Sequence, residues 1–590
     1  MARIIARKRG RETYYYFRES ERVKISVADR GGKGPGSGQS RVVTHDVYLG
    51  TAESIRRTIR EGRPLRVSPR AFGLVMAAYR TATDLGIAAA VDRLIPQRPR
   101  GISVGTYVLL MVVAKVASPH ASWRAFGPWL QKTSLARVLD LPPSLLDAQN
   151  FWDAFDRILP ERAYQANLNA ASKKKSGASD EHSLLNDDVV LAIEQAVWQE
   201  LLRQDTVDRS TLLIDATNFF TYLAQENPSR LAKAGHNKQG RHDKRQIALS
   251  MAVTRDGALP LLHLTYPGNV ADAKAFPEIL ARLADRIRSL EPGVGELTLV
   301  FDRGHNSKSN LAAVADAHLF AVGGLILSQH PDLVALPART ARQTVGDIRV
   351  IRTHKEVYGQ AAIVLVTYSD KLARKQRVSF TLALRRVKAA VWQAFRAHRD
   401  DDDERFAEAM ERTLAKSRAG RYLEWEVDTD RTLHVRQRRD LAERHRREFG
   451  VRLLFTTRLD LSDSDILRLY NHDKQEVEQD FRQLKSPDLL RFSPIRHFTD
   501  TKIRLYAMVC ILALLVLKVM HRRTLALGLS LEAMAQELRD IQEAIVVYSP
   551  QVAVHTLTEC STIQGQLVQA FRLREYLPDQ TLAEAGVSLH

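Results

Sequence analysis

Cysteine is nearly absent from this sequence: its 590 residues include only Cys510 and Cys560. Two cysteines cannot build a disulfide framework or a cysteine-rich zinc module. The 18 histidines form no close H-x-x-x-H pair with an acid, so the sequence also lacks the usual pattern of a zinc hydrolase. Such cysteine usage is typical of a reducing compartment.

Long hydrophobic runs are also missing. The longest, Leu505 to Leu517, has 13 residues between Arg504 and Lys518, whereas a membrane-spanning helix needs roughly 20. We therefore expect a buried helix there and no membrane partner. The basic start, Met1 to Arg11, continues into Glu12 to Phe17 rather than an apolar core, so no export signal is expected and the predicted location is the cytoplasm.

Acidic residues are too few to balance the basic ones: 68 Asp and Glu face 87 Lys and Arg, which gives a net charge of +19. This excess favours a polyanionic partner, nucleic acid first of all. Residues 1–70 contain 17 basic and 7 acidic residues, so +10 of the net charge lies there. The glycine-rich run Gly31 to Gly38 lacks the Gly-Lys-Ser/Thr ending of a phosphate-binding loop, which favours a flexible turn.

Changes in composition predict several domains, as expected for this length. Three β-rich runs, Thr13 to Phe17, Val23 to Val27 and Val42 to Leu49, precede a stretch of helical periodicity and then alternating strands and helices. The predicted parts are a basic β-rich N-terminal unit (1–67), a helical unit (68–170), a linker (171–184), a mixed α/β core in two segments (185–329 and 447–550), an insertion (330–446) and a tail (551–590).

Two apolar strand-like runs end in an acid. Leu212 to Ile214 precedes Asp215, and Leu297 to Phe301 precedes Asp302. If both strands belong to one sheet, the two carboxylates meet, and their repulsion requires a divalent cation with a preference for oxygen ligands, Mg²⁺ or Mn²⁺. The alternative is that each aspartate only caps the turn after its strand.

A third acid lies in a predicted helix that Ser462 caps and Ser486 ends. At 100° per residue, four charged side chains fall within an arc of about 80° beside the apolar stripe of this helix. They are Lys474, Glu478, Arg482 and Lys485. Glu478 could reach a metal while the three cations hold phosphates, or the row could be a surface ladder of weak ion pairs.

Taken together, these motifs resemble the DDE transposases of bacterial insertion sequences, in the branch with a Y-R-E-K signature around the third acid. The resemblance covers roughly residues 185–520. It rests on the segments Leu213 to Thr217, Pro267-Gly268-Asn269 with Asp272, Phe301 to Gly304, and Glu478 followed seven residues later by Lys485.

The resemblance implies a multidomain α/β protein with a ribonuclease-H-like mixed-sheet core, interrupted by a large insertion. Asp215 would lie on the first strand, Asp302 after the fourth and Glu478 on a later helix. In the Y-R-E-K pattern, tyrosine and arginine lie seven and four residues before the glutamate; here those positions hold Asn471, with Tyr470 adjacent, and Lys474. The resemblance therefore assigns a role to Glu478 and Lys485 but none to Tyr470.

A basic, turn-rich stretch from Gly235 to Gln246 lies between the first two core strands, where the family has a similar segment. We expect Lys238 and Arg241 to contact DNA phosphates; a solvated hairpin connection is the alternative. Asp272 is expected to be the first-turn acid of its helix rather than a catalytic group.

The resulting hypothesis is a transposase that cuts the ends of its insertion sequence and joins the 3′-hydroxyl ends to target DNA. Asp215, Asp302 and Glu478 would hold two Mg²⁺ ions, with Mn²⁺ as a substitute, and Lys485, Arg482 and Lys474 would contact the DNA backbone. The resemblance implies double-stranded DNA partners, namely terminal inverted repeats and target, a homodimer on paired ends, and a bacterial, nucleoid-associated location. Two alternatives stay open: a catalytically silent DNA-binding descendant and a nuclease of the same core fold.

Overall fold

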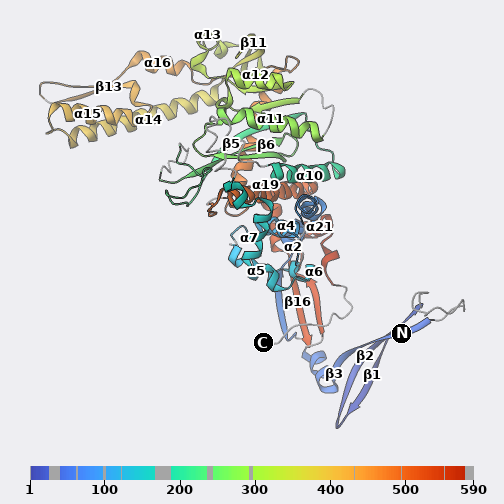
Figure 1. The fold of residues 1–590 in the computed structure, drawn as a ribbon. Coiled ribbons are helices and arrows are strands. Elements are labelled where there is room, and N and C mark those ends of the chain that lie inside the picture. Colours follow the sequence, from blue (N-terminus) through green and yellow to red (C-terminus); the bar gives the residue numbers. More distant parts are fainter. Residues whose placement is uncertain are drawn as a thin grey trace. The chain divides into compact units, whose positions relative to one another are not determined.

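The computed structural model divides the chain into two compact units (Figure 1). The first unit comprises Met1–Leu201, Gln483–Phe492 and Thr501–His590, and the second comprises Leu202–Arg482 and Ser493–Asp500. The residues that the structure describes are 2–24, 40–61, 64–96, 101–120, 123–166, 188–235, 243–290, 297–430, 432–492, 495–549 and 552–578. The predicted linker, 171–184, and the glycine run Gly31 to Gly38 lie outside them.

A mixed sheet forms the centre of the second unit. Its nine described strands follow the order β10-β11-β12-β15-β9-β8-β5-β6-β7. Neighbouring strands are antiparallel except β5-β8 and β8-β9, which are parallel. The strands are β5 (Thr211–Phe220), β6 (Gln246–Thr254), β7 (Pro260–Pro267), β8 (Leu297–Phe301), β9 (Leu319–Gly324), β10 (Thr344–Val345), β11 (Ile348–Val357), β12 (Gln360–Ser369) and β15 (Val451–Thr456).

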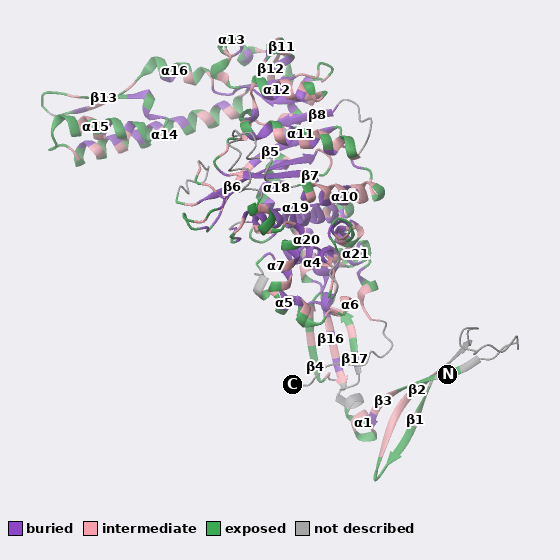
Figure 2. Ribbon diagram, in the orientation of Figure 1, coloured by how far each residue is buried: buried purple, intermediate pink, exposed green. Residues whose placement is uncertain are grey.

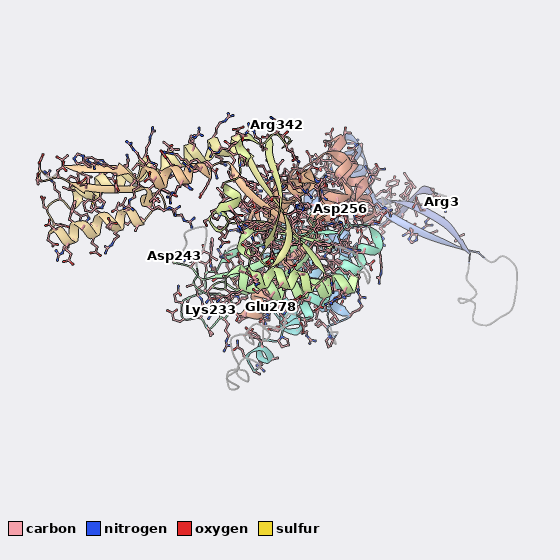
Figure 3. The ribbon with its side chains drawn as sticks, turned by 90° about the horizontal axis from the view of Figure 1, so that it is seen from above. Arg3, Lys233, Asp243, Asp256, Glu278 and Arg342 are labelled. Carbon is pink, nitrogen blue, oxygen red and sulfur yellow. The ribbon has the colours of Figure 1, made fainter. Side chains whose placement is uncertain are left out.

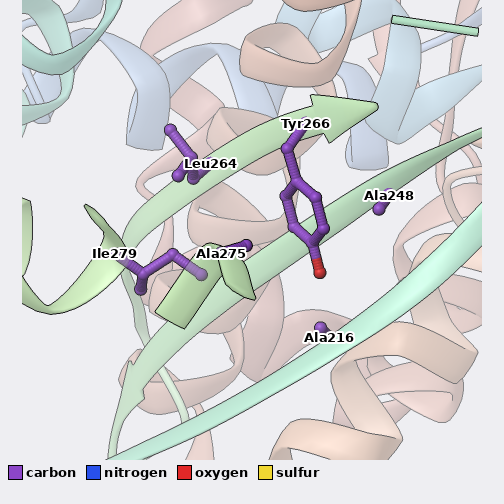
Figure 4. Packing of buried hydrophobic residues seen from close by; sticks show 6 residues of the cluster. All are labelled: Ala216, Ala248, Leu264, Tyr266, Ala275 and Ile279. Atoms are coloured by element: carbon purple, nitrogen blue, oxygen red, sulfur yellow. The ribbon is translucent and has the colours of Figure 1, made fainter. Parts of the chain in front are cut away.

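Helix α11 (Asp272–Leu290) covers one face of this sheet, as Figure 4 shows in close-up. Ala216 on β5 packs there with Tyr266 on β7 and with Ala275 and Ile279 of the helix. Successive side chains of a strand point to opposite faces. Asp215, the neighbour of Ala216, therefore points to the other face of the sheet.

That other face carries α17 (Asp463–Arg468), whose buried Ile466 and Leu467 pack against Leu365 of β12 and Leu454 of β15. Ser462 caps α17 by accepting a hydrogen bond from the Asp465 amide at 3.1 Å, which confirms the predicted helix start. The helix does not run straight to Ser486, however. A π-helical turn, η7 (Leu469–Asp473), precedes α18 (Lys474–Lys485).

The predicted insertion falls into two parts. Strands β10 to β12 extend the central sheet, whereas the following residues form an arm of helices and a hairpin (Figure 1). Aromatic pairs such as Phe380–Tyr422 and Phe395–Phe406 form the core of this arm. The elements of the arm are α14 (Asp370–Ala397), α15 (Asp403–Ala415), β13 (Leu423–Val427), β14 (Leu433–Gln437) and α16 (Arg439–Arg447).

The first unit begins with a three-stranded antiparallel sheet, β1 (Ala2–Arg9), β2 (Glu12–Lys24) and β3 (Ser40–Thr51). Asp46 on β3 accepts hydrogen bonds from Arg7 and Arg18 at 2.5 and 2.6 Å, which ties the three strands together. The sequence predicted two separate strands where β2 runs unbroken. Arg3 lies exposed on β1 (Figure 3).

Helices make up most of the remaining first unit, and Figure 2 shows its buried interior. Helix α19 (Asp500–Arg523) is long and apolar enough to cross a membrane by length and composition, but its apolar window is 100% buried, as predicted for a core helix. The other longer helices described are α2 (Gly73–Asp84), α4 (Val104–Ala117), α5 (Trp123–Gln131), α7 (Ala148–Ile158), α10 (Asp188–Gln204), α20 (Leu531–Asp540) and α21 (Thr562–Ala570).

A second small sheet joins distant parts of the first unit. Its strands are β4 (Arg66–Ala71), β16 (Gln542–Ser549) and β17 (Val552–Leu557). Glu543 on β16 is fully buried, and its carboxylate contacts Arg137 at 2.9 Å and His555 at 2.5 Å. Burial alone would raise the pKa of Glu543, but hydrogen bonds from His555 and Ser134 and the charge of Arg137 lower it.

We expect Glu543→Gln to destabilise the protein by roughly 2–3 kcal/mol at neutral pH, because it leaves Arg137 without its charge partner. A carboxylate with a lowered pKa in the folded state stabilises the fold above its unfolded-state pKa, and the contribution is lost as the pH falls through the folded-state pKa. The stability difference between the wild type and the variant should therefore shrink as the pH falls below about 4. Thermal unfolding at several pH values measures this difference, with Glu559→Gln, at an exposed position, as the control. An equal effect of both variants would contradict a stabilising role of the buried Glu543 carboxylate.

Candidate functional site

Two of the predicted acids lie side by side at the ends of parallel strands. The last paired residues of β5 and β8 are Ile214 and Phe301, so Asp215 and Asp302 are the next residue on each strand. Adjacent strands lie about 4.8 Å apart. Because Ile214 and Phe301 share one face, Asp215 and Asp302 both continue onto the opposite face, the one that carries α17.

Asp302 has two close neighbours. Its Oδ1 accepts a hydrogen bond from the Arg303 amide at 2.8 Å and faces the Tyr470 hydroxyl at 3.3 Å. Burial and the charge of Asp302 raise the pKa of Tyr470. The phenol therefore stays protonated and donates a hydrogen bond to the Asp302 carboxylate.

The π-turn explains why Tyr470 reaches the site although it lies eight residues before Glu478. In a regular α-helix, a residue eight positions away lies about 80° off, whereas one seven positions away lies within about 20°. A π-turn accommodates one extra residue, and Tyr470 lies in the π-turn η7, which precedes the helix of Glu478. Tyr470 and Glu478 accordingly line the same pocket. The sequence signal for this residue is a tyrosine one position before Asn471, where the Y-R-E-K spacing would place it.

This pocket has a volume of about 430 Å³ and lies within the second unit. Asp302 and Glu478 supply its negative charge, and three arginines supply the positive charge. The guanidinium groups suit phosphate oxygens because they donate several hydrogen bonds in one plane. Its lining includes Asp302, Glu478, Tyr470, Asn471, Gln475, Arg303, Arg452, Arg482, Leu372 and Gln376. Asp215 is not part of that lining.

The other predicted DNA contacts have different outcomes. Arg482 is exposed and lines the pocket beside Glu478. Lys485 is half-buried at the end of α18. The side chain of Lys474, and Lys238 and Arg241 entirely, lie outside the described residues.

Arg245 belongs to the basic stretch but is buried and serves the fold of the preceding loop. Its guanidinium donates hydrogen bonds to carbonyl groups of that loop, including Ala232 at 2.7 Å and Asn227 at 2.7 Å. Asp500 accepts a hydrogen bond from the Arg230 amide at 3.0 Å. Lys233 and Asp243, labelled in Figure 3, lie on either side of the undescribed residues 236–242.

Asp272 is the first residue of α11, as expected, and accepts a hydrogen bond from the Tyr266 hydroxyl at 2.7 Å. Burial and the charges of Asp272 and Asp215 raise the pKa of Tyr266. Asp272 thus anchors the start of α11 to β7 on the α11 face of the sheet, and Asp215 is within electrostatic reach of the same phenol.

The donor set partly fits a divalent metal. Carboxylate oxygens on adjacent strands are the ligands that Mg²⁺ prefers, and Mg²⁺ is often held by only one or two carboxylates together with substrate phosphates. Among the described residues, no three His, Cys, Asp or Glu side chains gather closely enough to hold one ion. Asp215 and Asp302 follow adjacent parallel strands, and Glu478 lines the same pocket as Asp302.

Acids at the ends of parallel strands lie beside a pocket whose arginines suit phosphate groups. The family model described as the transposase DDE domain matches residues 207–516, more than half of the chain, and the chain belongs to that family. It is thus a protein of DNA transposition and recombination.

Among solved structures, the chain is similar to the piggyBac transposase synaptic complex with hairpin DNA, determined by cryo-EM. The TM-score is 0.38 and the identity 10%, over 88% of this chain and 89% of that chain. A comparison with curated protein sequences found no match.

The packing of Tyr470 can be tested through Gly324, the last residue of β9. A Cβ atom at this position would lie 2.3 Å from the Tyr470 hydroxyl. We expect Gly324→Ala to displace Tyr470 from Asp302 and to lower the rate of DNA cleavage by roughly 10- to 100-fold, the value of a hydrogen bond to a charged group. Strand-nicking kinetics measure the effect.

Gly304→Ala is the matched control, because an added methyl at Gly304 meets nothing within 4 Å. Tyr470→Phe, which keeps the ring and removes the hydroxyl, should reproduce part of the loss. Full activity of both Gly324→Ala and Tyr470→Phe would exclude a role for the Tyr470–Asp302 contact.

Proposed function

We propose that this protein cleaves the ends of an insertion sequence and transfers the resulting 3′-hydroxyl ends to target DNA by two-metal-ion phosphoryl transfer. The observation that carries the proposal is the register of β5 and β8, which makes Asp215 and Asp302 neighbours on one face of the sheet. The pocket shared by Asp302 and Glu478 supports the third member of the set.

A ribonuclease-H-like core is part of the proposal. The strands β7-β6-β5-β8-β9 follow the order third, second, first, fourth and fifth along the chain, with β6 antiparallel to β5 and β8 and β9 parallel to it. Asp215 would then belong to the first strand and Asp302 would follow the fourth. The arm would be the insertion before the third acid.

Asp215, Asp302 and Glu478 would hold the metal. Two Mg²⁺ ions, or Mn²⁺ in their place, would activate the attacking oxygen and stabilise the leaving oxygen of the phosphodiester. Tyr470 donates to Asp302 Oδ1 and so orients that carboxylate. Arg303, Arg452 and Arg482 would hold the phosphates on either side of the cut, because they bring fixed positive charge to the rim of the pocket.

Other parts of the chain would choose and pair the DNA. The basic residues of 1–67 and the helical segment 68–170 would bind terminal inverted repeats, with base-edge contacts supplying sequence choice. Lys485, Lys474, Lys238 and Arg241 would add phosphate contacts. Two ends must be processed together, so the working form would be a homodimer, in the bacterial cytoplasm at the nucleoid.

The test is a cleavage assay with Mg²⁺ on DNA that carries the element ends. Asp215→Asn, Asp302→Asn and Glu478→Gln should each lower the cleavage rate by roughly a thousandfold or more, because each removes a charge that holds the metal. Binding to the same DNA should change by no more than about twofold, since the cationic surfaces are intact.

Glu476→Gln is the matched control. Glu476 lies two residues before Glu478 and outside the pocket lining, so this variant should keep full activity. If all three acid variants cleave like the wild type, the proposal is wrong. A wild type that binds but never cleaves would support the silent descendant, and cleavage without strand-transfer products would support a nuclease.

A further inference from the structure

The outer face of α14, the long helix of the arm, combines exposed cations with exposed apolar side chains. The buried side chains Phe380, Leu384, Val387, Val391 and Phe395 define its inner face. At about 100° per residue, five cations on the opposite side fall within an arc of about 100°. They are Lys371, Arg374, Lys375, Arg385 and Arg396, all exposed.

The charge of α14 is concentrated and unbalanced. Its 28 residues include eight Lys or Arg and one acid, Asp370. This net +7, together with the +10 of residues 1–70, accounts for +17 of the +19 carried by the whole chain. The rest of the protein is therefore almost neutral, and α14 is the second centre of positive charge.

Among the described residues, the five cations of this face form no ion pair with an acid, whereas several arginines on other elements of the arm do. Arg405 pairs with Asp402, Arg412 with Glu408, and Arg436 with Glu426. Within the part of the chain that the structure describes, no carboxylate forms an ion pair with Lys371, Arg374, Lys375, Arg385 or Arg396. Solvent-exposed cations that the fold leaves unpaired are available to an external anion.

Helix α14 begins at the candidate site. Leu372 and Gln376, in the first two turns of α14, line the pocket of Asp302 and Glu478. The Gln376 side chain accepts a hydrogen bond from the Gly450 amide at 2.7 Å, which fixes the start of the helix against the residue before β15. By helical geometry these two side chains lie about 110° and 150° around the axis from the middle of the cation face, so DNA that leaves the pocket would reach the cations by passing around the start of α14.

We propose that the outer face of α14 binds the phosphate backbone of duplex DNA as it leaves the site. At 1.5 Å per residue the helix is about 42 Å long, which matches about 12 base pairs at 3.4 Å each. Val378, Leu382 and Trp392, exposed between the cations, would contact the sugars. The path of the DNA away from the site rests on the proposed function. The binding of DNA to α14 does not depend on it.

The same pattern of cations and apolar residues could suit an anionic lipid surface. Two observations favour DNA. The apolar residues are separated by cations rather than gathered into one stripe, and the helix starts at an arginine-lined pocket. Lipid binding is therefore the competing outcome of the test.

The test measures how the affinity of the full-length protein for a 40-base-pair duplex of arbitrary sequence, in EDTA, depends on salt. The variant Arg374→Gln/Arg385→Gln/Arg396→Gln removes three cations spread along α14. Each lost phosphate contact should reduce the slope of log Kd against log salt by about 0.9, so the slope should fall by about 2–3. At about 0.15 M salt the affinity should fall on the order of 10- to 100-fold.

The matched control, Arg405→Gln/Arg412→Gln/Arg436→Gln, removes the same charge from the other elements of the arm and should leave the slope unchanged. Equal slopes for the wild type and the α14 variant, or equal losses in both variants, would overturn the proposal. Loss of binding to phosphatidylserine vesicles without loss of DNA binding would assign the face to lipid instead.

The readout needs neither metal nor cleavage. A protein that fails to cut DNA but shows the α14-dependent slope would contradict the proposed function and leave this inference standing. A protein that cuts DNA but shows no α14-dependent slope would contradict this inference and leave the proposed function standing.

Discussion

The parallel pairing of β5 with β8 is the constraint on which the site depends. It makes neighbours of Asp215 and Asp302. Two unit charges about 5 Å apart repel by on the order of 3 kcal/mol at an effective dielectric constant of 20. A sheet keeps such an arrangement only if other interactions compensate for the repulsion, and in the proposed function a divalent cation would do so.

The second requirement is that the helix with the third acid reaches the same edge of the sheet. Buried Ile466 and Leu467 fix α17 on the sheet, and Tyr470 closes against Gly324, where a larger residue would not fit. The π-turn then carries the chain onward to Glu478. The π-turn thus satisfies two demands at once: it packs an aromatic ring beside Asp302 and places Glu478 at the pocket.

The sequence was sufficient for the features that depend on local patterns. Apolar runs predicted β5, β6, β7 and β8, the cap at Ser462 predicted the start of α17, and the length of the run from Leu505 to Leu517 predicted a buried helix. The sequence was insufficient for features that depend on which distant strands pair with one another. Nothing local indicates that β11 and β12 extend the central sheet beside β15, or that β4 pairs with β16 more than 470 positions later.

The candidate site shows the same division. Strand ends and helical spacing made Asp302, Glu478 and Arg482 candidates, the family resemblance favoured them, and all three line one pocket. Tyr470 was passed over because the spacing assumed a regular helix, and only the fold reveals the π-turn. Arg245 lies in the basic stretch where Lys238 and Arg241 were expected to contact phosphates, yet it is buried and donates hydrogen bonds to five loop carbonyls. Composition does not distinguish a buried guanidinium from an exposed one.

The distribution of charge connects the fold to the handling of a long substrate. An active site in a nearly neutral body attracts DNA only weakly, because non-specific affinity grows with the number of phosphates that are neutralised. Residues 1–70 and α14 carry almost the whole net charge, and they lie in different units. If both bind one DNA molecule, the two weak contacts reinforce each other, because the first contact raises the effective concentration of DNA at the second. Cleavage can then use a pocket that itself binds only a few phosphates.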